Sequence, residues 1–415
     1  MTDFLDNVAK ATNAMRKLFP ETPLQKNEFL SNRYSADIYL KREDLSPVRS
    51  YKVRGAFNAM QKALTQAGKP EMFVCASAGN HAQGMAFACR HFGVKGVIFM
   101  PVTTPGQKII KTATFGGKFI EIRLEGDYFD DTLVAAKSFA AEMGAQFLPP
   151  YDSLDVIEGQ ATIAQEIRQQ LKRKIDHMVV PVGGGGLSSG LIKYYDTIKD
   201  SPEFHLVEPS GARSLYASLD KGQLVSIPTI DNFVDGAAVA QIGHHNFEIL
   251  KNVPKNNLLG IDEDRLCTTI LELLNIEGIV LEPAGALTID ALKDLSDDIA
   301  GKCVVCVTSG GNFDFERLPD VKERALRSEG LKKYLILRLP QRPGALKDFL
   351  NLLGPDDDIA RFEYLKKSAR NFGTVLLGIE TKSKGGFKHL FDRMDEASLS
   401  YRDITDDETL AQFLV

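Results

Sequence analysis

The chain has 415 residues, enough for two or three domains, and a quarter of them are charged, which is typical of a soluble globular protein. Its net charge of −5 gives no sign of a nucleic-acid partner. The N-terminus lacks a signal-peptide pattern, and no apolar stretch is long enough to span a membrane. We therefore expect a cytoplasmic protein that acts on neither a membrane nor a nucleic acid.

The first three quarters of the chain alternate short apolar strands with amphipathic helices. A helix is predicted over Asp3–Leu18, where apolar residues recur on one face. Strands are predicted at Ile38–Leu40, Met72–Ala76, Val97–Met100, Phe119–Ile122, Met178–Val182, Phe204–Val207 and Val304–Thr308. Further helices are predicted at Asn80–Phe92, Gln107–Phe115, Asp130–Met143 and Leu187–Ile198. This alternation indicates an α/β fold with parallel sheets covered on both faces, which bind ligands at the carboxyl ends of their strands.

The pattern changes after about Arg317. The charged stretch Pro319–Lys333 lacks a strand pattern and is interpreted as a linker. Beyond it, strands are predicted at Tyr334–Leu339, Ile359–Tyr364, Thr374–Ile379 and Tyr401–Ile404, with helices at Ala345–Leu353 and Phe387–Ala397. The resulting order, βαββαβ, predicts a compact two-layer unit of the ferredoxin type.

The five cysteines give no disulfide framework, because their number is odd and their spacing is not clustered. Cys303 and Cys306 have the spacing of a chelating pair, but they lie in an apolar predicted strand and would point to its opposite faces. No metal-binding or Ser–His–Asp triad is evident among the seven histidines. We therefore predict no metal site.

Two segments have the chemistry to hold one cofactor. Lys52 is predicted near the start of a helix that runs to about Leu64, where the helix dipole would lower the pKa of the ammonium group. The loop Gly183–Leu187 follows a strand and opens a helix, so its consecutive N–H groups could bind a phosphate. Its spacing is not GxGxxG, and a dinucleotide fingerprint is not supported. A reactive lysine and a phosphate cradle together indicate pyridoxal phosphate, although either feature alone could be structural.

The turn Ser77–His81 also joins a predicted strand to a predicted helix. Ser77 could simply cap that helix, which would explain it without any function. Asn80 could donate a hydrogen bond to a ring oxygen, whereas His81 could merely be packed. A further loop, Ser309–Asn312, follows the last apolar strand of this region and would lie at the same edge of a parallel sheet as the glycine loop.

These segments resemble the fold-type II pyridoxal-phosphate enzymes, whose fold is like that of tryptophan synthase β, and most closely the biosynthetic threonine dehydratases. The motifs that carry the resemblance are Leu40–Leu45, Ser50–Ala56, Ser77–Gly84, Met100-Pro101, Pro105, Gly183–Leu187, Glu282–Ala286 and Ser309–Asn312. It covers essentially the whole chain, and Val53, where leucine is more usual, is a minor departure. It implies a two-lobed catalytic domain over 1–318 with its smaller lobe at about 41–150, a linker over 319–330 and one ACT-like regulatory domain over 331–415.

The resemblance also implies a role for each motif. Lys52 would hold the cofactor covalently and then take the α-proton of the substrate as a base. Asn80 would meet the ring hydroxyl of the cofactor and Ser309 its pyridine nitrogen. The phosphate would be bound by Gly183, Gly184, Gly185, Gly186 and Leu187. The substrate carboxylate would be bound by Ser77, Ala78, Gly79, Asn80 and His81.

The implied reaction is β-elimination of water from L-threonine to give 2-oxobutanoate and ammonia, the committed step of isoleucine biosynthesis. A hydroxyl such as that of Ser309 does not hold a full positive charge on the pyridine nitrogen, so elimination competes well against reprotonation. Ala78 stands where the similar serine racemases have a second catalytic serine, and we expect no significant racemisation. The rival interpretations are a degradative serine/threonine dehydratase and, less favoured, a non-catalytic amino-acid sensor.

Two further expectations come from the resemblance. Glu208–Ser214 aligns with a cation site of racemase relatives, but Ser214 replaces a carboxylate, so a monovalent ion or a simple helix-start turn are the alternatives left. Only one ACT-like unit is present, and it could complete an effector pocket by pairing across a dimer. The expected effectors are isoleucine as inhibitor and valine as antagonist, in a homo-oligomer that is a dimer or a tetramer.

Overall fold

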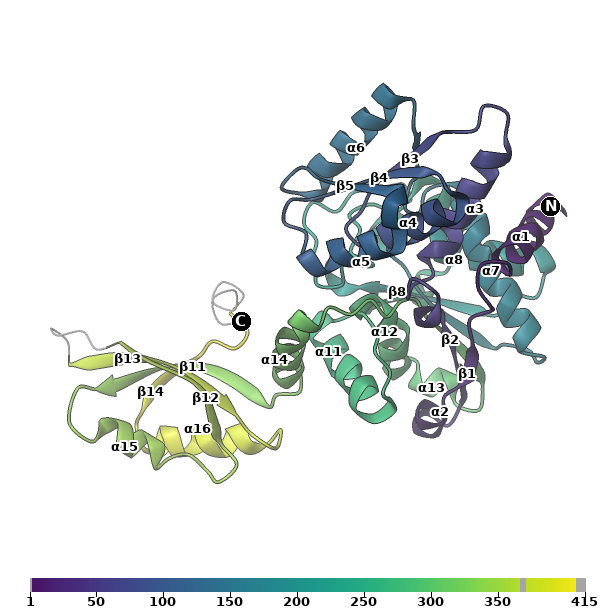
Figure 1. Ribbon diagram of the computed structural model, residues 1–415. Helices are drawn as coiled ribbons and strands as arrows, with labels where there is room; N and C mark the ends of the chain where they lie inside the picture. The colour runs from purple at the N-terminus through teal and green to yellow at the C-terminus, as the bar shows by residue number, and fades with distance from the viewer. Residues whose placement is uncertain (1, 366–370, 408–415) are drawn as a thin grey trace. The chain divides into compact units, whose positions relative to one another are not determined.

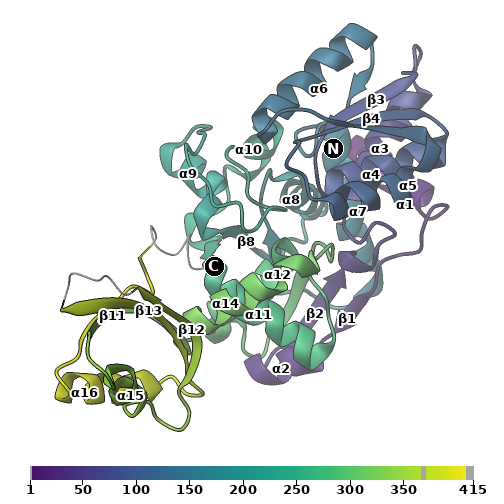
Figure 2. The same ribbon diagram turned by 60° about the vertical axis from the view of Figure 1, so that its left-hand side comes forward.

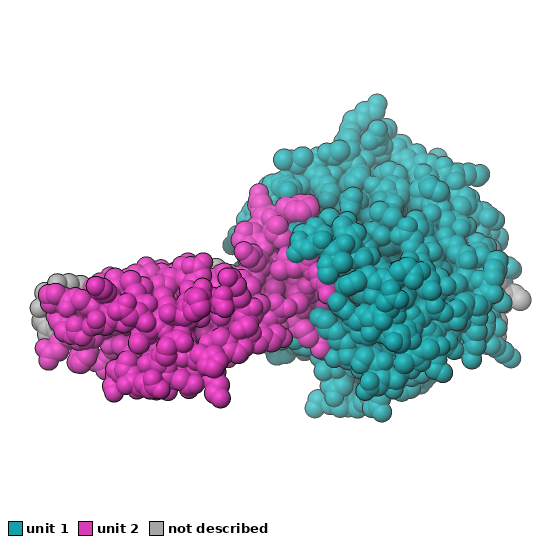
Figure 3. Space-filling model, turned by 90° about the horizontal axis from the view of Figure 1, so that it is seen from below, with its two compact units in different colours: residues 1–263, 273–313 teal, residues 264–272, 314–415 magenta. Residues whose placement is uncertain are grey.

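The computed structural model describes residues 2–365 and 371–407 (Figure 1). The chain forms two compact units, which Figure 3 colours separately: Met1–Glu263 with Leu273–Phe313, and Asp264–Glu272 with Asp314–Val415. No helix within the described ranges has the length and apolar character needed to cross a membrane.

The larger sheet of the first unit has six strands in the order β1-β2-β10-β7-β8-β9, and all neighbours except β1 and β2 are parallel. Its strands are β1 (Leu24–Lys26), β2 (Asp37–Arg42), β7 (His177–Pro181), β8 (Glu203–Pro209), β9 (Leu258–Ile261) and β10 (Cys303–Thr308). The middle strands are buried along almost their whole length, as expected of a parallel sheet covered on both faces. The carboxyl ends of β7 and β10 lead directly into the glycine loop and the Ser309 loop.

The smaller sheet of the first unit is wholly parallel, in the order β5-β4-β3-β6. Its strands are β3 (Met72–Ala76), β4 (Lys95–Met100), β5 (Ile120–Leu124) and β6 (Gln146–Phe147), and its connecting helices are α4 (Asn80–Phe92), α5 (Gly106–Gly116) and α6 (Phe129–Met143). Alternate strand residues face opposite sides. Cys75 and Ile98 pack in one core with α4, whereas Val74 and Val97 pack in another with α6.

The remaining α-helices of the first unit cover the larger sheet or connect the two sheets (Figure 1). They are α1 (Thr2–Met15), α2 (Glu28–Tyr34), α3 (Lys52–Thr65), α7 (Leu154–Gln170), α8 (Gly186–Ile198), α9 (Ser214–Lys221), α10 (His244–Leu250), α12 (Pro283–Asp290) and α13 (Ser296–Ile299). Every strand and helix predicted from the sequence in this unit is present, with ends shifted by a few residues. The longest helix that was not predicted is α7.

The second unit confirms the predicted βαββαβ order. Its antiparallel sheet has the order β12-β13-β11-β14, and the helices α15 (Ala345–Leu350) and α16 (Gly386–Glu396) lie on one face of that sheet (Figure 2). The elements are β11 (Lys332–Pro340), α15 (Ala345–Leu350), β12 (Asp358–Leu365), β13 (Phe372–Glu380), α16 (Gly386–Glu396) and β14 (Ser400–Asp403), joined in the same unit by α11 (Glu263–Glu272) and α14 (Leu318–Ser328).

The segment expected to be a linker is therefore helical over most of its length, since α14 covers residues 318–328. Arg324 and Arg327 of α14 form ion pairs with Asp264 of α11 at 2.8 and 2.7 Å. The charged residues of the predicted linker thus belong to α14, and ion pairs connect this helix to α11. The residue limits of the domains stay predictions.

Candidate active site

Lys52 is the first residue of α3, and the loop before it is fixed to the loop that follows β10. The amide of Tyr51 donates to the carbonyl of Ser309 at 3.1 Å, and the amide of Gly311 donates to the carbonyl of Arg49 at 2.9 Å. These contacts hold Lys52 and Ser309 in one site at the carboxyl edge of the larger sheet, as the sequence predicted for a ligand-binding edge.

The amine of Lys52 lies in a low-polarity environment. Its Nζ donates to the carbonyl of Pro150 at 3.0 Å and lies 5.4 and 5.9 Å from the ring centres of Tyr51 and Tyr151. Burial lowers the pKa of Lys52 from 10.5 to about 8, although the nearby Glu282 carboxyl opposes this shift. Burial, rather than the helix dipole proposed from the sequence, is thus the main cause, and it favours the free amine that a covalent attachment requires.

The glycine loop forms a cradle between β7 and α8. Gly185 has a φ of 89°, a conformation that favours glycine. A Cβ on Gly184 would lie 2.2 Å from the ring of Tyr151, so no larger residue fits there without movement. The carbonyl of Gly184 is held by Asn246 Nδ2 at 2.7 Å and by the amide of Gly243 at 3.1 Å. Within the described ranges, the N–H groups of residues 183–187 donate to no protein acceptor, and they remain available for an anion.

Asn80 begins α4 and lies in a chain of side-chain hydrogen bonds. Its Nδ2 donates to Glu282 Oε1 at 2.7 Å, and its Oδ1 accepts from Asn312 Nδ2 at 2.7 Å. Asn312 also donates to the carbonyl of Val48 at 2.9 Å, in the loop that precedes Lys52. Burial, and then the charge of Asp235, raise the pKa of Glu282 from 4.5 to about 7. Asn80 is therefore fixed from two sides by residues remote in the sequence.

Ser309 and the turn after β3 provide neutral polar groups. The buried hydroxyl of Ser309 donates to the carbonyl of Ala284 at 3.2 Å. In the turn, Ser77 Oγ accepts from the amide of Gly79 at 3.2 Å, while Ala78 is half-buried against the core of the smaller sheet. His81 Nε2 bonds the carbonyl of Leu148 at 2.9 Å, and burial, followed by the charge of Lys52, lowers its pKa to about 3.

The residues present fit pyridoxal phosphate. The unused N–H groups of the glycine loop match its phosphate, and the amine of Lys52 matches its aldehyde. Ser309 lies in the loop that holds Lys52, Asn80 is hydrogen-bonded to Asn312 of that loop, and both side chains could meet polar atoms of the ring. Bound there, the cofactor would be held at both ends by groups that are fixed by the surrounding hydrogen bonds.

Two family models match the chain. "Pyridoxal-phosphate dependent enzyme" matches residues 16–310, and "C-terminal regulatory domain of Threonine dehydratase" matches residues 323–414. The chain belongs to the threonine dehydratase family of pyridoxal-phosphate-dependent enzymes. This confirms the resemblance, the fold class and the cofactor that the sequence predicted.

Relatives within this family cover nearly the whole chain. "L-threonine dehydratase biosynthetic IlvA" of Halalkalibacterium halodurans is 43% identical over 99% of both chains, and that of Bacillus subtilis is 45% identical over 99% of this chain and 97% of its own. The solved structure of threonine deaminase isoform 2 from Solanum lycopersicum is 33% identical with a TM-score of 0.72, and covers 78% of this chain and 93% of its own.

Sequence reasoning did not identify every residue that shapes this site. Glu282 and Asn312 were part of the family motifs but received no role, and Tyr151 was not singled out at all. Tyr151 lies in the connection between β6 and α7, where no periodic pattern or motif marks it. Its ring packs on Gly184 and faces Lys52, so it contacts both halves of the cofactor site.

For Glu208, the sequence left a monovalent cation site and a simple helix-start turn as alternatives. Its carboxylate accepts hydrogen bonds from the amides of Leu215 and Tyr216 at 2.7 and 3.0 Å, at the start of α9. Burial raises the pKa of Glu208 to about 7 despite these bonds. The capping of α9 is sufficient to explain this carboxyl, which agrees with the helix-start alternative.

Proposed function

We propose that this protein uses pyridoxal phosphate to eliminate water from L-threonine, releasing 2-oxobutanoate and ammonia as the committed step of isoleucine biosynthesis. One observation supports this above all: a lysine with a pKa near 8 lies with a glycine cradle in one site. The full-length similarity to biosynthetic L-threonine dehydratases names the substrate.

We propose the same roles for the site residues as the resemblance implied. Bound pyridoxal phosphate supplies an electron sink for the α-carbon of the substrate. The glycine loop binds the phosphate through its N–H groups, and Asn80 orients the ring. The Ser77–His81 turn binds the substrate carboxylate. Nζ of Lys52 would hold the cofactor and, once the substrate amine has displaced it, would be free to accept the α-proton, for which a pKa near neutrality is favourable.

Two neutral side chains direct the outcome of this proposed reaction. Ser309 offers a neutral hydroxyl, which carries no charge that could hold a proton on a ring nitrogen. Ala78 has no group that could deliver a proton to the α-carbon from the side opposite Lys52. Loss of the β-hydroxyl is then favoured over return of the proton, which supports elimination rather than racemisation.

We propose that the second unit senses isoleucine as inhibitor and valine as antagonist. The match to a regulatory domain of threonine dehydratase and the βαββαβ order support a regulatory role. We also propose a homo-oligomer, a dimer or a tetramer, in which two such units share an effector pocket. A cytoplasmic location is consistent with the five buried cysteines, which form no disulfide.

The test is release of 2-oxo acid from L-threonine by purified protein loaded with pyridoxal phosphate, with and without L-isoleucine. Activity that isoleucine suppresses supports both proposals, and removal of residues 331–415 should then abolish the suppression. Activity that is indifferent to isoleucine would support the dehydratase and leave residues 331–415 with a structural role or another effector. Lys52→Ala should abolish turnover in an enzyme, whereas a non-catalytic sensor would keep its ligand response and have no turnover to lose.

A further inference from the structure

A second group of ligating side chains lies at the opposite end of the same strands. His177 is the first residue of β7, and Glu203 and His205 lie at the start of β8. The parallel register pairs His177 with Glu203, and His205 is two residues further along the same strand, so all three side chains share one face of the sheet. The strand β7 separates them from the glycine loop by roughly 20 Å, at ~3.3 Å per residue.

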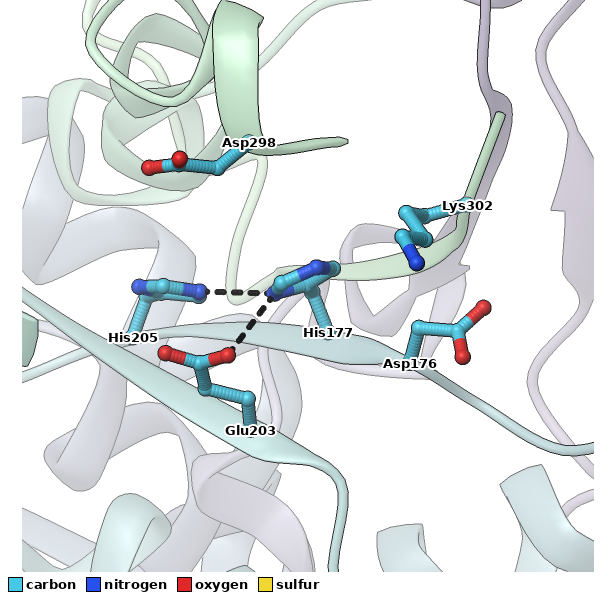
Figure 4. A pocket seen from close by; sticks show the side chains of 6 residues that line it. All are labelled: Asp176, His177, Glu203, His205, Asp298 and Lys302. Carbon is cyan, nitrogen blue, oxygen red and sulfur yellow. Dashed lines mark hydrogen bonds and ion pairs between the residues drawn. The ribbon is translucent and has the colours of Figure 1, made fainter. Parts of the chain in front are cut away.

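The three side chains are close enough to share one ion. His177 Nδ1 lies 3.0 Å from His205 Nε2 and 3.7 Å from Glu203 Oε2 (Figure 4). One ligand atom from each residue lies within 4.8 Å of the others. Tetrahedral zinc, with bonds of about 2.0–2.2 Å to nitrogen and oxygen, places its ligand atoms about 3.4 Å apart. Small side-chain rotations would therefore bring these three atoms to coordination distance.

The surroundings favour a cation over an anion. A pocket of about 450 Å³ is lined by the cluster together with Asp176, Asp298 and Lys302 (Figure 4). Its three carboxylates outnumber its single ammonium group. The other oxygen of Glu203 accepts from Asn257 Nδ2 at 3.3 Å, which orients the carboxylate while leaving Oε2 toward His177.

The two imidazoles are prepared for coordination. Both rings are buried, and an imidazole binds a metal through a ring nitrogen that carries no proton. The Nδ1 of His205 is buried without a hydrogen-bond partner within the described ranges. The other ring nitrogen of His205, Nε2, faces Nδ1 of His177, and it is the atom that a shared ion would bind.

We propose that His177, Glu203 and His205 bind a transition-metal dication of the zinc class, at a site separate from that of the cofactor. Two imidazoles and one carboxylate are a donor set that Zn²⁺ prefers, and water or Asp298 would provide the fourth ligand. On binding, the hydrogen bond between the rings is replaced by two metal–nitrogen bonds. Each imidazole then keeps its proton on the ring nitrogen that faces away from the metal, which is Nδ1 in His205.

No sequence motif marks this cluster, because its histidines are 28 residues apart and lie on two strands. Only the register of β7 against β8 brings them together. The proposal does not depend on the reaction at the cofactor site, and its test uses metal binding rather than turnover as its readout.

The experiment titrates Zn²⁺ into metal-free holoenzyme, with calorimetry for affinity and metal analysis after dialysis for stoichiometry. We expect one ion per chain, and at least a tenfold loss of affinity in Glu203→Gln and in His177→Gln, since even loss of an outer-sphere partner costs about 10–100-fold. The side chain of Glu203 is 53% exposed, so this variant should fold even where His177→Gln does not.

A matched control uses the other histidine–carboxylate pair of the first unit. His245 Nδ1 lies 3.1 Å from Asp152 Oδ1 on the surface, and the ring centre of His244 is 5.8 Å from that of His245. Within the described ranges these three side chains do not bring their ligand atoms within 4.8 Å of one another, so His245→Gln should leave Zn²⁺ affinity unchanged. Co²⁺ in place of Zn²⁺ should give the absorption of a tetrahedral site in wild type and lose it in Glu203→Gln. Wild type that binds no Zn²⁺, or an affinity that falls only in His245→Gln, would overturn the proposal.

Discussion

Asn80 donates a hydrogen bond of 2.7 Å to Glu282, a carboxyl 202 residues away in the sequence. Glu282 lies just before α12, and its pKa is raised to about 7. Its charge also raises the pKa of Lys52 and so opposes the effect of burial there. Glu282 therefore affects both Asn80 and Lys52, which are proposed to bind the cofactor. It holds Asn80 by a hydrogen bond and raises the pKa of Lys52 through its charge.

We expect kcat/KM for L-threonine to rise with pH as Glu282 ionises near pH 7. The ionised carboxylate makes Lys52 the stronger base, and it is present only above the raised pKa of Glu282. Glu282→Gln should lower kcat/KM by roughly 10- to 100-fold and remove this rise. The measurement is a pH–rate profile of both proteins.

Glu208→Gln provides the matched control for that profile. Glu208 is also buried with a pKa raised to about 7, but it caps α9 through Leu215 and Tyr216. Its replacement should keep the rise near pH 7. A rise that disappears in Glu208→Gln and persists in Glu282→Gln would contradict the assignment.

Gly184→Ala should weaken the binding of pyridoxal phosphate. Its new Cβ would overlap the ring of Tyr151, and overpacking of this kind costs about 1–3 kcal/mol, or up to about 100-fold in Kd. Fluorescence titration of the apoenzyme measures this effect. Gly106→Ala is the control, because a Cβ there meets no atom within 4 Å. Equal Kd values for Gly184→Ala and wild type would show that the loop does not hold the phosphate.

The pKa of Lys52 predicts how the cofactor is loaded. Only the free amine reacts, so the rate of reconstitution of the apoenzyme should rise with pH and level off above about 8. An ordinary lysine would continue to gain reactivity up to about pH 10.4. Stopped-flow absorbance after mixing apoenzyme with pyridoxal phosphate follows the reaction. A rate that still increases steeply at pH 10 would show that burial does not lower this pKa.

The sequence predicted the strands and helices whose apolar residues are continuous or clearly periodic, but not α14, which has a solvent face and lies in the segment interpreted as a linker. It failed at α7, because this helix is buried around most of its circumference. Glu158, Gln160 and Glu166 point into the interior, where Lys41 and Arg54 pair with Glu166, so no amphipathic pattern is visible. Charged residues in the core remove the amphipathic pattern, so the sequence of a buried helix resembles that of an irregular polar segment.

The motifs of the candidate site could be predicted because their chemistry is local in sequence. A few neighbouring residues are enough to recognise a glycine run after a strand, or a lysine at the start of a helix. The pairing of Asn80 with Glu282, and the packing of Tyr151 on Gly184, depend on how distant elements meet. Contacts of this kind depend on how the strands and helices are arranged in space, so they cannot be predicted from any single segment of the sequence.

Ala78 predicts that the enzyme does not interconvert substrate isomers. Alanine offers no proton for the face opposite Lys52, so L-threonine or L-serine should yield 2-oxo acid without D-isomer. Chiral chromatography of the residual amino acid measures this. Ala78→Ser would restore a hydroxyl and should give detectable D-serine from L-serine. Substantial D-isomer from wild type would refute the role assigned to this position.

Glu166→Gln should destabilise the first unit strongly. Its carboxylate is buried and accepts from Lys41 at 2.7 Å and from Arg54 at 2.8 Å, and it also pairs with Arg16. Removing one partner of a buried ionic network leaves uncompensated charge and costs about 3–5 kcal/mol. Urea unfolding measures this as a lower midpoint at an unchanged slope. Glu121→Gln, which breaks a solvent-exposed pair with Arg123, should cost less than about 1 kcal/mol.

The pKa of Glu166 also predicts how the difference in free energy of unfolding between wild type and Glu166→Gln depends on pH. Arg54 and Lys41 hold the pKa of Glu166 well below its usual 4.5, against the opposing effect of burial. A carboxyl whose pKa is lower in the folded state contributes stability above its unfolded pKa and loses it as the pH falls toward its folded pKa. The difference in free energy of unfolding between wild type and Glu166→Gln should thus have its full value at pH 7 and decrease below about pH 4.5. If this difference in free energy of unfolding stays constant down to pH 3, the network stabilises the fold through packing rather than through charge.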